Sequence, residues 1–280
     1  MSDPSLLLLI PAYNEEARIE PVLREYATFF ARNYAGRFQL VVVLNGCRDN
    51  TLGVVQRVAK EFSALTWLDF PAPIGKGGAL IEGLKLAGNA DVIGYVDADG
   101  ATGPAAVLQL LPYMDKADCV VGSRWLPGSV LLKAQPKFRQ VISRCFHIIV
   151  ELLFWMHIKD TQCPCKLMRR AAVEKIHSNL RIADLAFDVN LLVAMKQAGF
   201  RLCEVPIEWT DVVGSKVTSS LFRQSLTMFL SVWRIRLIYW PRLYRRLRPL
   251  RPLEGWVYKK LRQPPPLRQP EKQEKTRNNG

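Results

Sequence analysis

The sequence lacks an uncharged apolar run of the roughly 18–20 residues that a membrane-spanning helix requires. The nearest candidates are residues 145–158, which Glu151 interrupts, and residues 224–233. The first three residues lead directly into an apolar run at residues 6–10, so we also expect no secretory signal peptide. We therefore predict that this chain does not cross a membrane.

Cysteine and histidine are sparse, with six cysteines and three histidines among 280 residues. The cysteines do not form paired Cys-x-x-Cys units, which argues against a zinc site. Cys163 and Cys165 are separated by one proline, too close for an ordinary disulfide between them, so we expect reduced thiols in a cytosolic compartment. We interpret His147 and His157 as packing or surface residues and not as metal ligands.

Acidic residues become scarce towards the C-terminus of this chain, whose formal net charge is +14. From residue 221 onward there are fifteen Lys or Arg and three Asp or Glu. The first 220 residues carry 24 Lys or Arg and 22 Asp or Glu. Such a basic tail suits anionic lipid or nucleic acid. Within residues 219–262, Trp, Phe and Leu recur at helical spacing between arginines, which favours amphipathic helices lying in a membrane interface. The alternative is a C-terminal helix packed on the core with a solvated basic face.

The remaining sequence is typical of one large α/β domain, which we place at residues 1–218. Short apolar runs at residues 6–10, 40–44, 66–70 and 92–96 alternate with helical patterns, which predicts a mostly parallel sheet with right-handed crossovers. Further on, we expect a long helix or helix pair over residues 135–158, another helix starting at Phe187, and a strand over residues 201–208. The proline-rich, polar residues 263–280 are predicted to be disordered.

Two carboxylates follow the predicted strand at residues 92–96, in the sequence Asp97-Ala98-Asp99-Gly100. Open α/β sheets bind ligands at the carboxyl ends of their strands. Two acids one residue apart can face one Mg²⁺ or Mn²⁺ ion that keeps positions for water and substrate phosphates. The alternative is an ordinary turn at Asp99-Gly100, with Asp97 capping the next helix.

A glycine cluster, Gly75-Lys76-Gly77-Gly78, opens the helix predicted after the third strand. Helix N-terminal amides together with a lysine favour a bound phosphate. The spacing is not that of a P-loop, and an ordinary loop is the alternative.

Several stretches occur in the order seen in the family-two inverting glycosyltransferases. They are Pro11 to Glu15, Asn45 to Thr51, Gly75 to Gly78, Asp97 to Asp99, and Gly122-Ser123-Arg124. Three later stretches, at residues 160–166, 187–189 and 209–216, resemble the polyprenyl-phosphate sugar synthases. Within that class the chain is most similar to the dolichyl-phosphate glucosyltransferase branch, with the dolichyl-phosphate mannose synthases further away. The resemblance covers roughly residues 6–240 and implies a Rossmann-like A-type glycosyltransferase fold with C-terminal amphipathic helices.

The resemblance also implies roles for individual residues. The nucleotide-sugar pocket is expected to include Pro11, Tyr13, Glu15, Asn45, Lys76 and Asp97. Asp97 and Asp99 are expected to hold Mg²⁺ or Mn²⁺ on the diphosphate and to be catalytic.

The acceptor side of the site is assigned in the same way. The expected contacts to the acceptor phosphate are Arg124, Arg139, Ser143 and Lys216. Asp160, Gln162 and Asp188 complete the expected catalytic set beside the sugar and the acceptor.

This chain departs from the family pattern at four places. Asn45-Gly46 stands where many relatives have an aspartate, and Ala101 where the mannose synthases often have a glutamine. Pro164-Cys165 replaces the usual Gly-Phe, and Thr210 stands where the mannose synthases have an arginine.

The hypothesis is therefore a peripheral enzyme at the cytoplasmic face of a membrane that moves a hexose to a polyprenyl phosphate. UDP-glucose is the favoured donor over GDP-mannose. A phosphate acceptor is already anionic and needs cations such as Arg124, Arg139, Lys166 and Lys216 to position it. A sugar-hydroxyl acceptor would instead require a base, for which Asp160 and Asp188 are the candidates.

Three alternatives stay open. They are the same fold with a hydroxyl acceptor, a nucleotidyltransferase, and a basic nucleic-acid-binding protein. Because the C-terminal cations alternate with Trp and Leu, we expect an anionic membrane surface as the partner and no nucleic acid. The pattern leaves the oligomeric state open.

Overall fold

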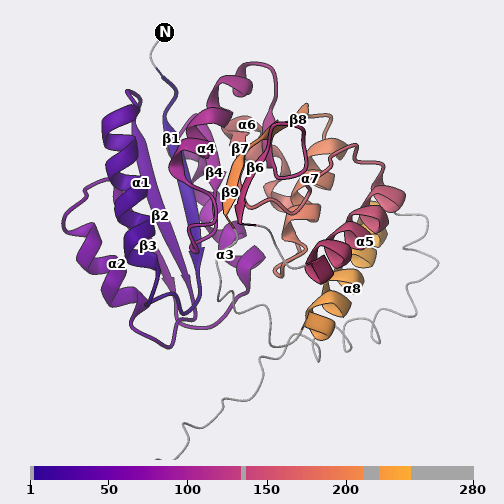
Figure 1. The fold of residues 1–280 in the computed structure, drawn as a ribbon, viewed down its shortest axis with the longest axis horizontal. Coiled ribbons are helices and arrows are strands. Elements are labelled where there is room, and N and C mark those ends of the chain that lie inside the picture. The colour runs from indigo at the N-terminus through magenta and orange to yellow at the C-terminus, as the bar shows by residue number, and fades with distance from the viewer. Residues whose placement is uncertain (1–2, 134–136, 211–220, 241–280) are drawn as a thin grey trace, which may run out of the picture.

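A computed structural model describes residues 3–133, 137–210 and 221–240, and every structural statement below concerns these ranges. The element order alternates strands and helices, as predicted (Figure 1). The strands are β1 Leu6–Ala12, β2 Phe38–Asn45, β3 Leu65–Phe70, β4 Val92–Tyr95, β5 Cys119–Ser123, β6 Val130–Lys133, β7 Lys166–Arg169, β8 Leu202–Pro206 and β9 Glu208–Thr210. The helices are α1 Ile19–Asn33, α2 Thr51–Ala59, α3 Lys76–Gly83, α4 Pro104–Leu110, α5 Lys137–Phe154, α6 Arg170–Ile176, α7 Phe187–Gln197 and α8 Leu221–Tyr239. Short 3₁₀ turns are η1 Leu84–Asn89, η2 Leu111–Asp115 and η3 His177–Asn179.

The main sheet has seven strands in the order β3-β2-β1-β4-β7-β5-β8. β1 pairs in parallel with β2 and β4, β2 with β3, and β5 with β8. This confirms the predicted mostly parallel α/β fold. β7 runs antiparallel to both β4 and β5. All strands except β7 therefore point the same way, and their carboxyl ends share one edge of the sheet with the amino end of β7.

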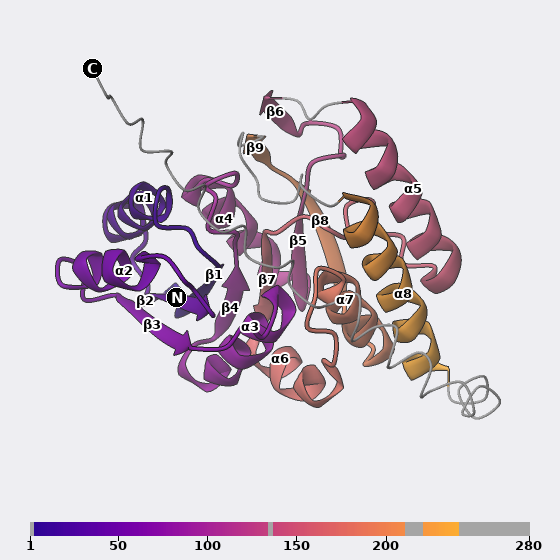
Figure 2. The same ribbon diagram turned by 90° about the horizontal axis from the view of Figure 1, so that it is seen from below.

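The apolar runs are continuous because helices cover both faces of the sheet. Alternate β1 residues separate into two cores: Leu6 and Leu8 pack with α1, α2 and α4, whereas Leu7 and Leu9 pack with α3, α6 and α7. Figure 2 shows these two sets of helices on opposite sides of the strands. Since successive side chains of a strand face opposite ways, a strand with helices on both sides has no polar face.

One predicted boundary was wrong, and one strand was not predicted. The helix expected over residues 135–158 ends at Phe154, and Trp155 and His157 beyond it adopt positive φ. Strand β7, which begins at Lys166, was not expected. Helix α1 begins only at Ile19, because Asn14 has a positive φ of 54° and the Glu15 amide donates to Thr51 Oγ1.

A second, two-stranded sheet pairs β6 with β9 in parallel beyond the edge of the main sheet. The Ile207 amide donates to Ser123 O, which continues β8 alongside β5. The Thr210 amide donates to Ala101 O at 2.9 Å. β9 is thereby held against the loop that follows β4.

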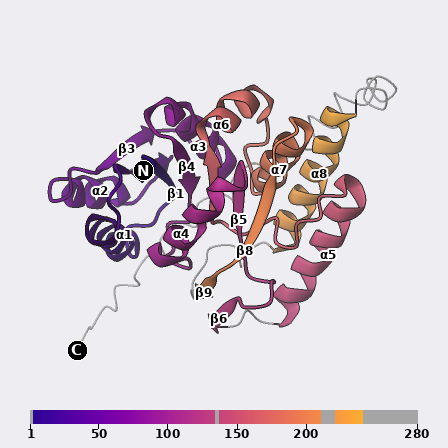
Figure 3. The same cartoon turned by 90° about the horizontal axis from the view of Figure 1, so that it is seen from above.

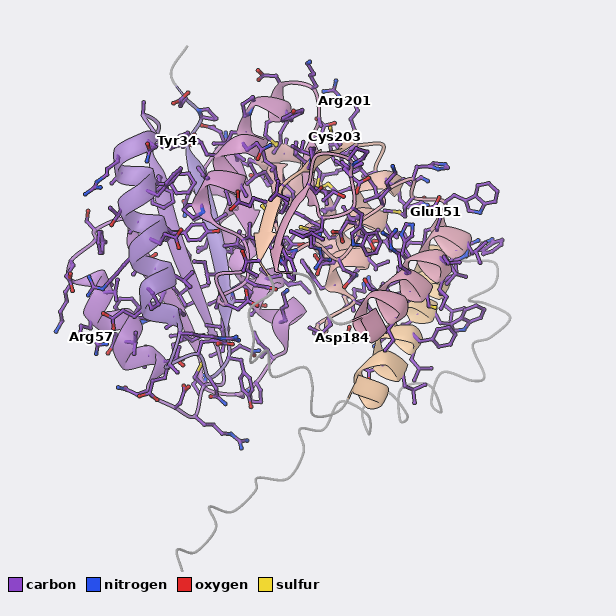
Figure 4. The ribbon with its side chains drawn as sticks, viewed as in Figure 1. Tyr34, Arg57, Glu151, Asp184, Arg201 and Cys203 are labelled. Carbon is purple, nitrogen blue, oxygen red and sulfur yellow. The ribbon has the colours of Figure 1, made fainter. Side chains whose placement is uncertain are left out.

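Helix α8 lies beside α5 on the outside of the molecule (Figures 2 and 3). Val232 and Ile235 of α8 are buried in the core. Ser231 Oγ donates to the carboxylate of Asp184 at 2.6 Å, and Asp184, labelled in Figure 4, lies in the segment before α7. Of the helices that the structure describes, none is long and apolar enough to span a bilayer. The predicted helical residues 241–262 and the tail at 263–280 lie outside the described residues.

Gly94 in the middle of β4 is required by the approach of β7. A Cβ at this position would collide with the Leu167 side chain and lie 2.8 Å from the Lys166 backbone oxygen. We expect Gly94→Ala to lower the free energy of unfolding by about 1–3 kcal/mol, as overpacking does in cores. Urea denaturation measures this change.

Gly88→Ala is the matched control, because a Cβ there meets nothing within 4 Å. We expect it to shift the free energy of unfolding by less than about 1 kcal/mol. Equal stability of Gly94→Ala and the native chain would contradict the close β4–β7 packing.

Candidate active site

Asp97 and Asp99 follow β4 at the edge where the strands end. Lys76 Nζ, from the first turn of α3, lies 2.5 Å from Asp97 Oδ1, and both side chains are partly exposed. Burial raises the pKa of Asp97, as does the charge of Asp99, while Lys76 opposes this rise. The structure thus brings together the two predicted metal ligands and the predicted phosphate lysine.

The alternative interpretation, an ordinary turn at Asp99-Gly100 with Asp97 as a helix cap, is correct only for the turn. Asp99 Oδ1 accepts a 3.0 Å bond from the Ala101 amide, and Gly100 has a φ of +75°. Asp97 does not cap the following helix, because α4 begins after Gly103, which makes no side-chain cap. One oxygen of Asp99 therefore shapes the loop, whereas Asp97 pairs with Lys76.

Asn45 organises the glycine cluster. Its Oδ1 atom accepts bonds from the amides of Ile74 at 2.7 Å and Gly75 at 3.0 Å. Gly75 has a φ of +83°, and a Cβ on Gly77 would lie 2.5 Å from Ile182 O. Backbone geometry thus accounts for these two glycines, and phosphate binding by the loop stays a prediction.

The predicted nucleotide side also contains a cation that was not expected from the sequence. Arg18 pairs with Glu15, one of the predicted pocket residues. The bond to Glu15 raises the pKa of Arg18 against the effect of burial, and the charges of Asp99 and Asp97 raise it further. Of the other predicted pocket residues, Pro11 lies in β1 and Tyr13 is exposed just beyond it.

Asp188 lies in the first turn of α7 inside a buried cluster. Lys166 Nζ donates to Asp188 Oδ1 at 2.5 Å and to Cys163 O at 2.7 Å. The Tyr95 hydroxyl, at the end of β4, donates to the same Oδ1 atom. The side chains of Lys166 and Asp188 are 0% and 4% exposed.

The charge state of Asp188 follows from these contacts. Burial on its own would raise the pKa of Asp188, but the charges of Lys166 and Lys76 and the bonds from Lys166 and Tyr95 outweigh it. The net pKa is lowered, so this carboxylate is ionised near neutral pH. The register places Lys166 opposite both Tyr95 and Val121, because β7 runs antiparallel and starts at this edge.

Asp160 is held by Arg124 in a two-pronged ion pair. The Arg124 Nε and Nη2 atoms lie 2.7 and 2.8 Å from the two Asp160 oxygens, and the Arg124 amide adds a 3.0 Å bond. The Asp160 side chain is fully buried. Arg124 therefore fixes Asp160 from the end of β5, and its contact with an acceptor phosphate stays a prediction.

The structure describes only some of the other residues predicted to lie beside the acceptor. Ser143 lies half-buried on α5. Arg139 belongs to the same helix, but its side chain is outside the described part, and Lys216 lies outside the described residues altogether. Gln162 lies in the turn between Asp160 and β7, and its Nε2 atom has no partner among the described residues.

A divalent cation fits Asp97 and Asp99. Both are hard oxygen donors, and their mutual repulsion contributes to the raised pKa of Asp97, which a cation would relieve. Within the described ranges, no group of three or more His, Cys, Asp or Glu side chains is arranged to hold an ion. Two carboxylates suit Mg²⁺ or Mn²⁺, which commonly take their other ligands from substrate phosphates and water.

Comparison with known proteins gives one family and one fold. Residues 8–177 match the sequence profile of Glycosyl transferase family 2. The dolichyl-phosphate beta-glucosyltransferase of Drosophila melanogaster is 33% identical over 230 residues, covering 77% of this chain and 70% of that protein. The enzyme of the same name from Saccharomyces cerevisiae is 30% identical, covering 86% of this chain and 76% of that protein.

Among solved structures, the fold resembles glucosyl-3-phosphoglycerate synthase from Mycobacterium tuberculosis. The complex of that enzyme with Mn²⁺, UDP-glucose and phosphoglyceric acid has a TM-score of 0.64 at 15% identity, covering 83% of this chain and 80% of that one. A further structure of the enzyme contains Mg²⁺ and UDP. At this identity the similarity establishes the fold.

The pairing of Asp188 with Lys166 predicts a pH-dependent stability defect. We expect Lys166→Met to lower the free energy of unfolding at pH 7 by about 3–5 kcal/mol, because it leaves a buried carboxylate without its main cation. The pKa of Asp188 would then rise above that of the unfolded chain, so the folded state would bind an extra proton as the pH falls. The defect should therefore shrink between pH 7 and 5.

Urea denaturation at several pH values tests this prediction. In the native protein the lowered pKa keeps Asp188 ionised across that pH range, so its contribution is lost only at more acidic pH. The control is Lys85→Met, which breaks an exposed pair with Glu82 and should cost less than about 1 kcal/mol. A Lys166→Met defect that is constant from pH 7 to 5 would contradict an ionic role.

Proposed function

Because this chain belongs to glycosyltransferase family 2, we propose that it transfers glucose from UDP-glucose to a polyprenyl phosphate, with inversion at the anomeric carbon. The relatives from fly and yeast bear the name dolichyl-phosphate beta-glucosyltransferase, which supports both the sugar and the acceptor class. The observation that carries the proposal is the state of the two candidate bases. Asp160 and Asp188 are buried, and each is paired with a cation.

A hydroxyl acceptor needs a group that removes its proton as it attacks. Asp188 is poorly suited, because its pKa is lowered and its Oδ1 atom already accepts two bonds. Asp160 gives both of its oxygens to Arg124. A phosphate acceptor requires no base, because its oxygen is already anionic near neutral pH.

The reaction then needs charge stabilisation more than proton transfer. The lipid phosphate oxygen forms a bond to the anomeric carbon while the bond from that carbon to the diphosphate breaks. Negative charge grows on the departing diphosphate, and Lys76, at the first turn of α3 beside Asp97, would neutralise it. A Mg²⁺ or Mn²⁺ ion held by Asp97 and Asp99 would supply further positive charge there.

The acidic pair is the first target for mutation. We expect the double variant Asp97→Asn, Asp99→Asn to transfer glucose at least about 100-fold more slowly, because losing preorganised charge at the leaving group commonly costs that much. The assay follows labelled glucose from UDP-glucose into the organic phase with short-chain polyprenyl phosphate and Mg²⁺ or Mn²⁺.

Asp115→Asn, a change on the exposed η2 turn, is the matched control and should retain full activity. Full activity of the double variant would remove the metal assignment. Transfer to sugar hydroxyls with an inert polyprenyl phosphate would identify the hydroxyl-acceptor alternative. Release of pyrophosphate in place of UDP would identify a nucleotidyltransferase.

We propose that the enzyme works as a peripheral protein on the cytoplasmic leaflet. The support is an exposed apolar surface, which we call the α5–α8 surface, formed by Ile148, Leu152, Trp155, Leu226, Phe229 and Trp233. Leu152 is 72% and Trp155 68% exposed. Exposed Trp, Leu, Ile and Phe side chains on or next to two neighbouring helices suit insertion into the lipid headgroup region.

Vesicle flotation tests the membrane proposal. We expect the native chain to float with vesicles containing anionic lipid, and the double variant Leu152→Glu, Trp155→Glu to float several-fold less, because charge on this face opposes insertion. Tyr113→Glu, at a 40% exposed position outside the α5–α8 surface, is the control. Equal flotation of all three proteins would contradict the assignment, and a salt-sensitive shift of DNA or RNA without flotation would favour nucleic acid.

A further inference from the structure

Three buried polar atoms near the site have no hydrogen-bond partner among the described residues. They are the indole Nε1 of Trp209, the amide Nε2 of Gln162 and the hydroxyl Oγ1 of Thr102. Buried polar groups in folded proteins are nearly always paired, because an unpaired one costs roughly 1–3 kcal/mol. Unpaired buried groups in one region therefore point to a ligand that pairs with them.

The three residues come from separate parts of the chain, and contacts made by Trp209 or by their sequence neighbours link them. Trp209 lies in β9. The amide of the next residue, Thr210, donates to the carbonyl oxygen of Ala101, which precedes Thr102. The Arg124 guanidinium lies 5.3 Å from the centre of the Trp209 ring. Arg124 in turn holds Asp160, two residues before Gln162. Trp209 thus stands between the loop after Asp99 and the Arg124–Asp160 pair.

The indole of Trp209 is positioned rigidly for this role. The residue is 6% exposed, so its ring is fixed by packing. The register of β9 against β6 and the bond of Thr210 to Ala101 fix its backbone. An N–H donor held this way pays little conformational entropy when a ligand arrives.

The chemistry of the cluster favours a neutral oxygen over a phosphate. Indole and amide N–H groups carry no formal charge, and the adjacent charges of Arg124 and Asp160 neutralise each other. A phosphate is recognised by uncompensated cations and by charge-assisted bonds. A sugar hydroxyl matches better, because it accepts one bond from an N–H and can exchange a second with a threonine hydroxyl.

We propose that the indole N–H of Trp209, assisted by the Gln162 amide, binds a hydroxyl of the transferred hexose and so determines which hexose is accepted. This inference rests on the proposed function, because it needs a nucleotide-sugar donor in the same site. Trp209 acts here as a specificity-determining residue. A site built to bond a hydroxyl rejects an analogue that lacks it, because the buried donor is then left unpaired.

The test compares binding of the nucleotide with binding of the nucleotide sugar, so it does not depend on the acceptor. Calorimetry on the full chain would measure Kd for UDP, UDP-glucose and the four monodeoxy analogues of UDP-glucose, with Mg²⁺ present. The variant is Trp209→Phe, which keeps an aromatic ring near Arg124 and removes the N–H. Trp67→Phe, on the edge strand β3, is the control.

We expect Trp209→Phe to weaken UDP-glucose binding by about 5- to 10-fold, the usual size of one hydrogen bond, and to leave UDP binding unchanged. One monodeoxy analogue should bind the native chain and Trp209→Phe equally, since the bonded hydroxyl is absent from it. Trp67→Phe should behave as the native chain with every ligand. When transfer is assayed with this analogue, the native chain and Trp209→Phe should have the same kcat/KM.

Two results would overturn the inference. Trp209→Phe binding UDP-glucose as tightly as the native chain would show that the indole N–H makes no bond to the hexose. Equal weakening of UDP, UDP-glucose and all four analogues would show that Trp209 only supports the packing, and urea denaturation of the variant would register that loss. Failure of the native chain to bind UDP or UDP-glucose would instead count against the proposed donor and, with it, the hexose contact.

Discussion

The buried ion pair between Lys166 and Asp188 is the constraint on which the site depends. It ties the amino end of β7 to the first turn of α7, and Tyr95 adds the carboxyl end of β4 to the same oxygen. Because neither charge reaches water, neither residue can be displaced alone without leaving the other buried and unpaired. Asp188 also interacts with Lys76, which holds Asp97. Charges of alternating sign thus connect the interior of the sheet to the loop that carries the acidic pair.

This arrangement has a chemical consequence for the acceptor. Asp188 is a weak base, because Lys166 and its other partners lower its pKa. Asp160 gives both of its oxygens to Arg124, so neither acid is available to accept a proton. The fold keeps these acids as fixed negative charges that orient the cations around them. An acceptor that arrives already ionised suits such a site, and a neutral hydroxyl does not.

Much of the fold could be predicted from the sequence, because strands covered on both faces leave continuous apolar runs, as in β1 and β2. The edge carrying Asp97 followed from the rule that parallel strands end together. β7 was missed because only two of its four residues, Leu167 and Met168, are apolar, and only the distant Asp188 makes Lys166 acceptable in a core. The pairing of Arg124 with Asp160, 36 residues away, likewise depends on which strands become neighbours. On α8, the residues that pack on the core are not the Trp and Phe residues that dominate the sequence pattern.

Trp209 Nε1, Gln162 Nε2 and Thr102 Oγ1 have no hydrogen-bond partner within the part of the chain that the structure describes. They contrast with the buried acids of the site, which are hydrogen-bonded. Asp160 accepts bonds at both carboxylate oxygens from Arg124, and Asp188 accepts bonds at Oδ1 from Lys166 and Tyr95. Leaving neutral donors unpaired near well-paired buried charges breaks the rule that buried polar groups are hydrogen-bonded. Natural proteins commonly break such rules at functional sites. Each unpaired donor lowers the stability of the free protein by roughly 1–3 kcal/mol, and a bound hexose would restore that loss. Donor binding and folding stability are therefore coupled through the same hydrogen bonds.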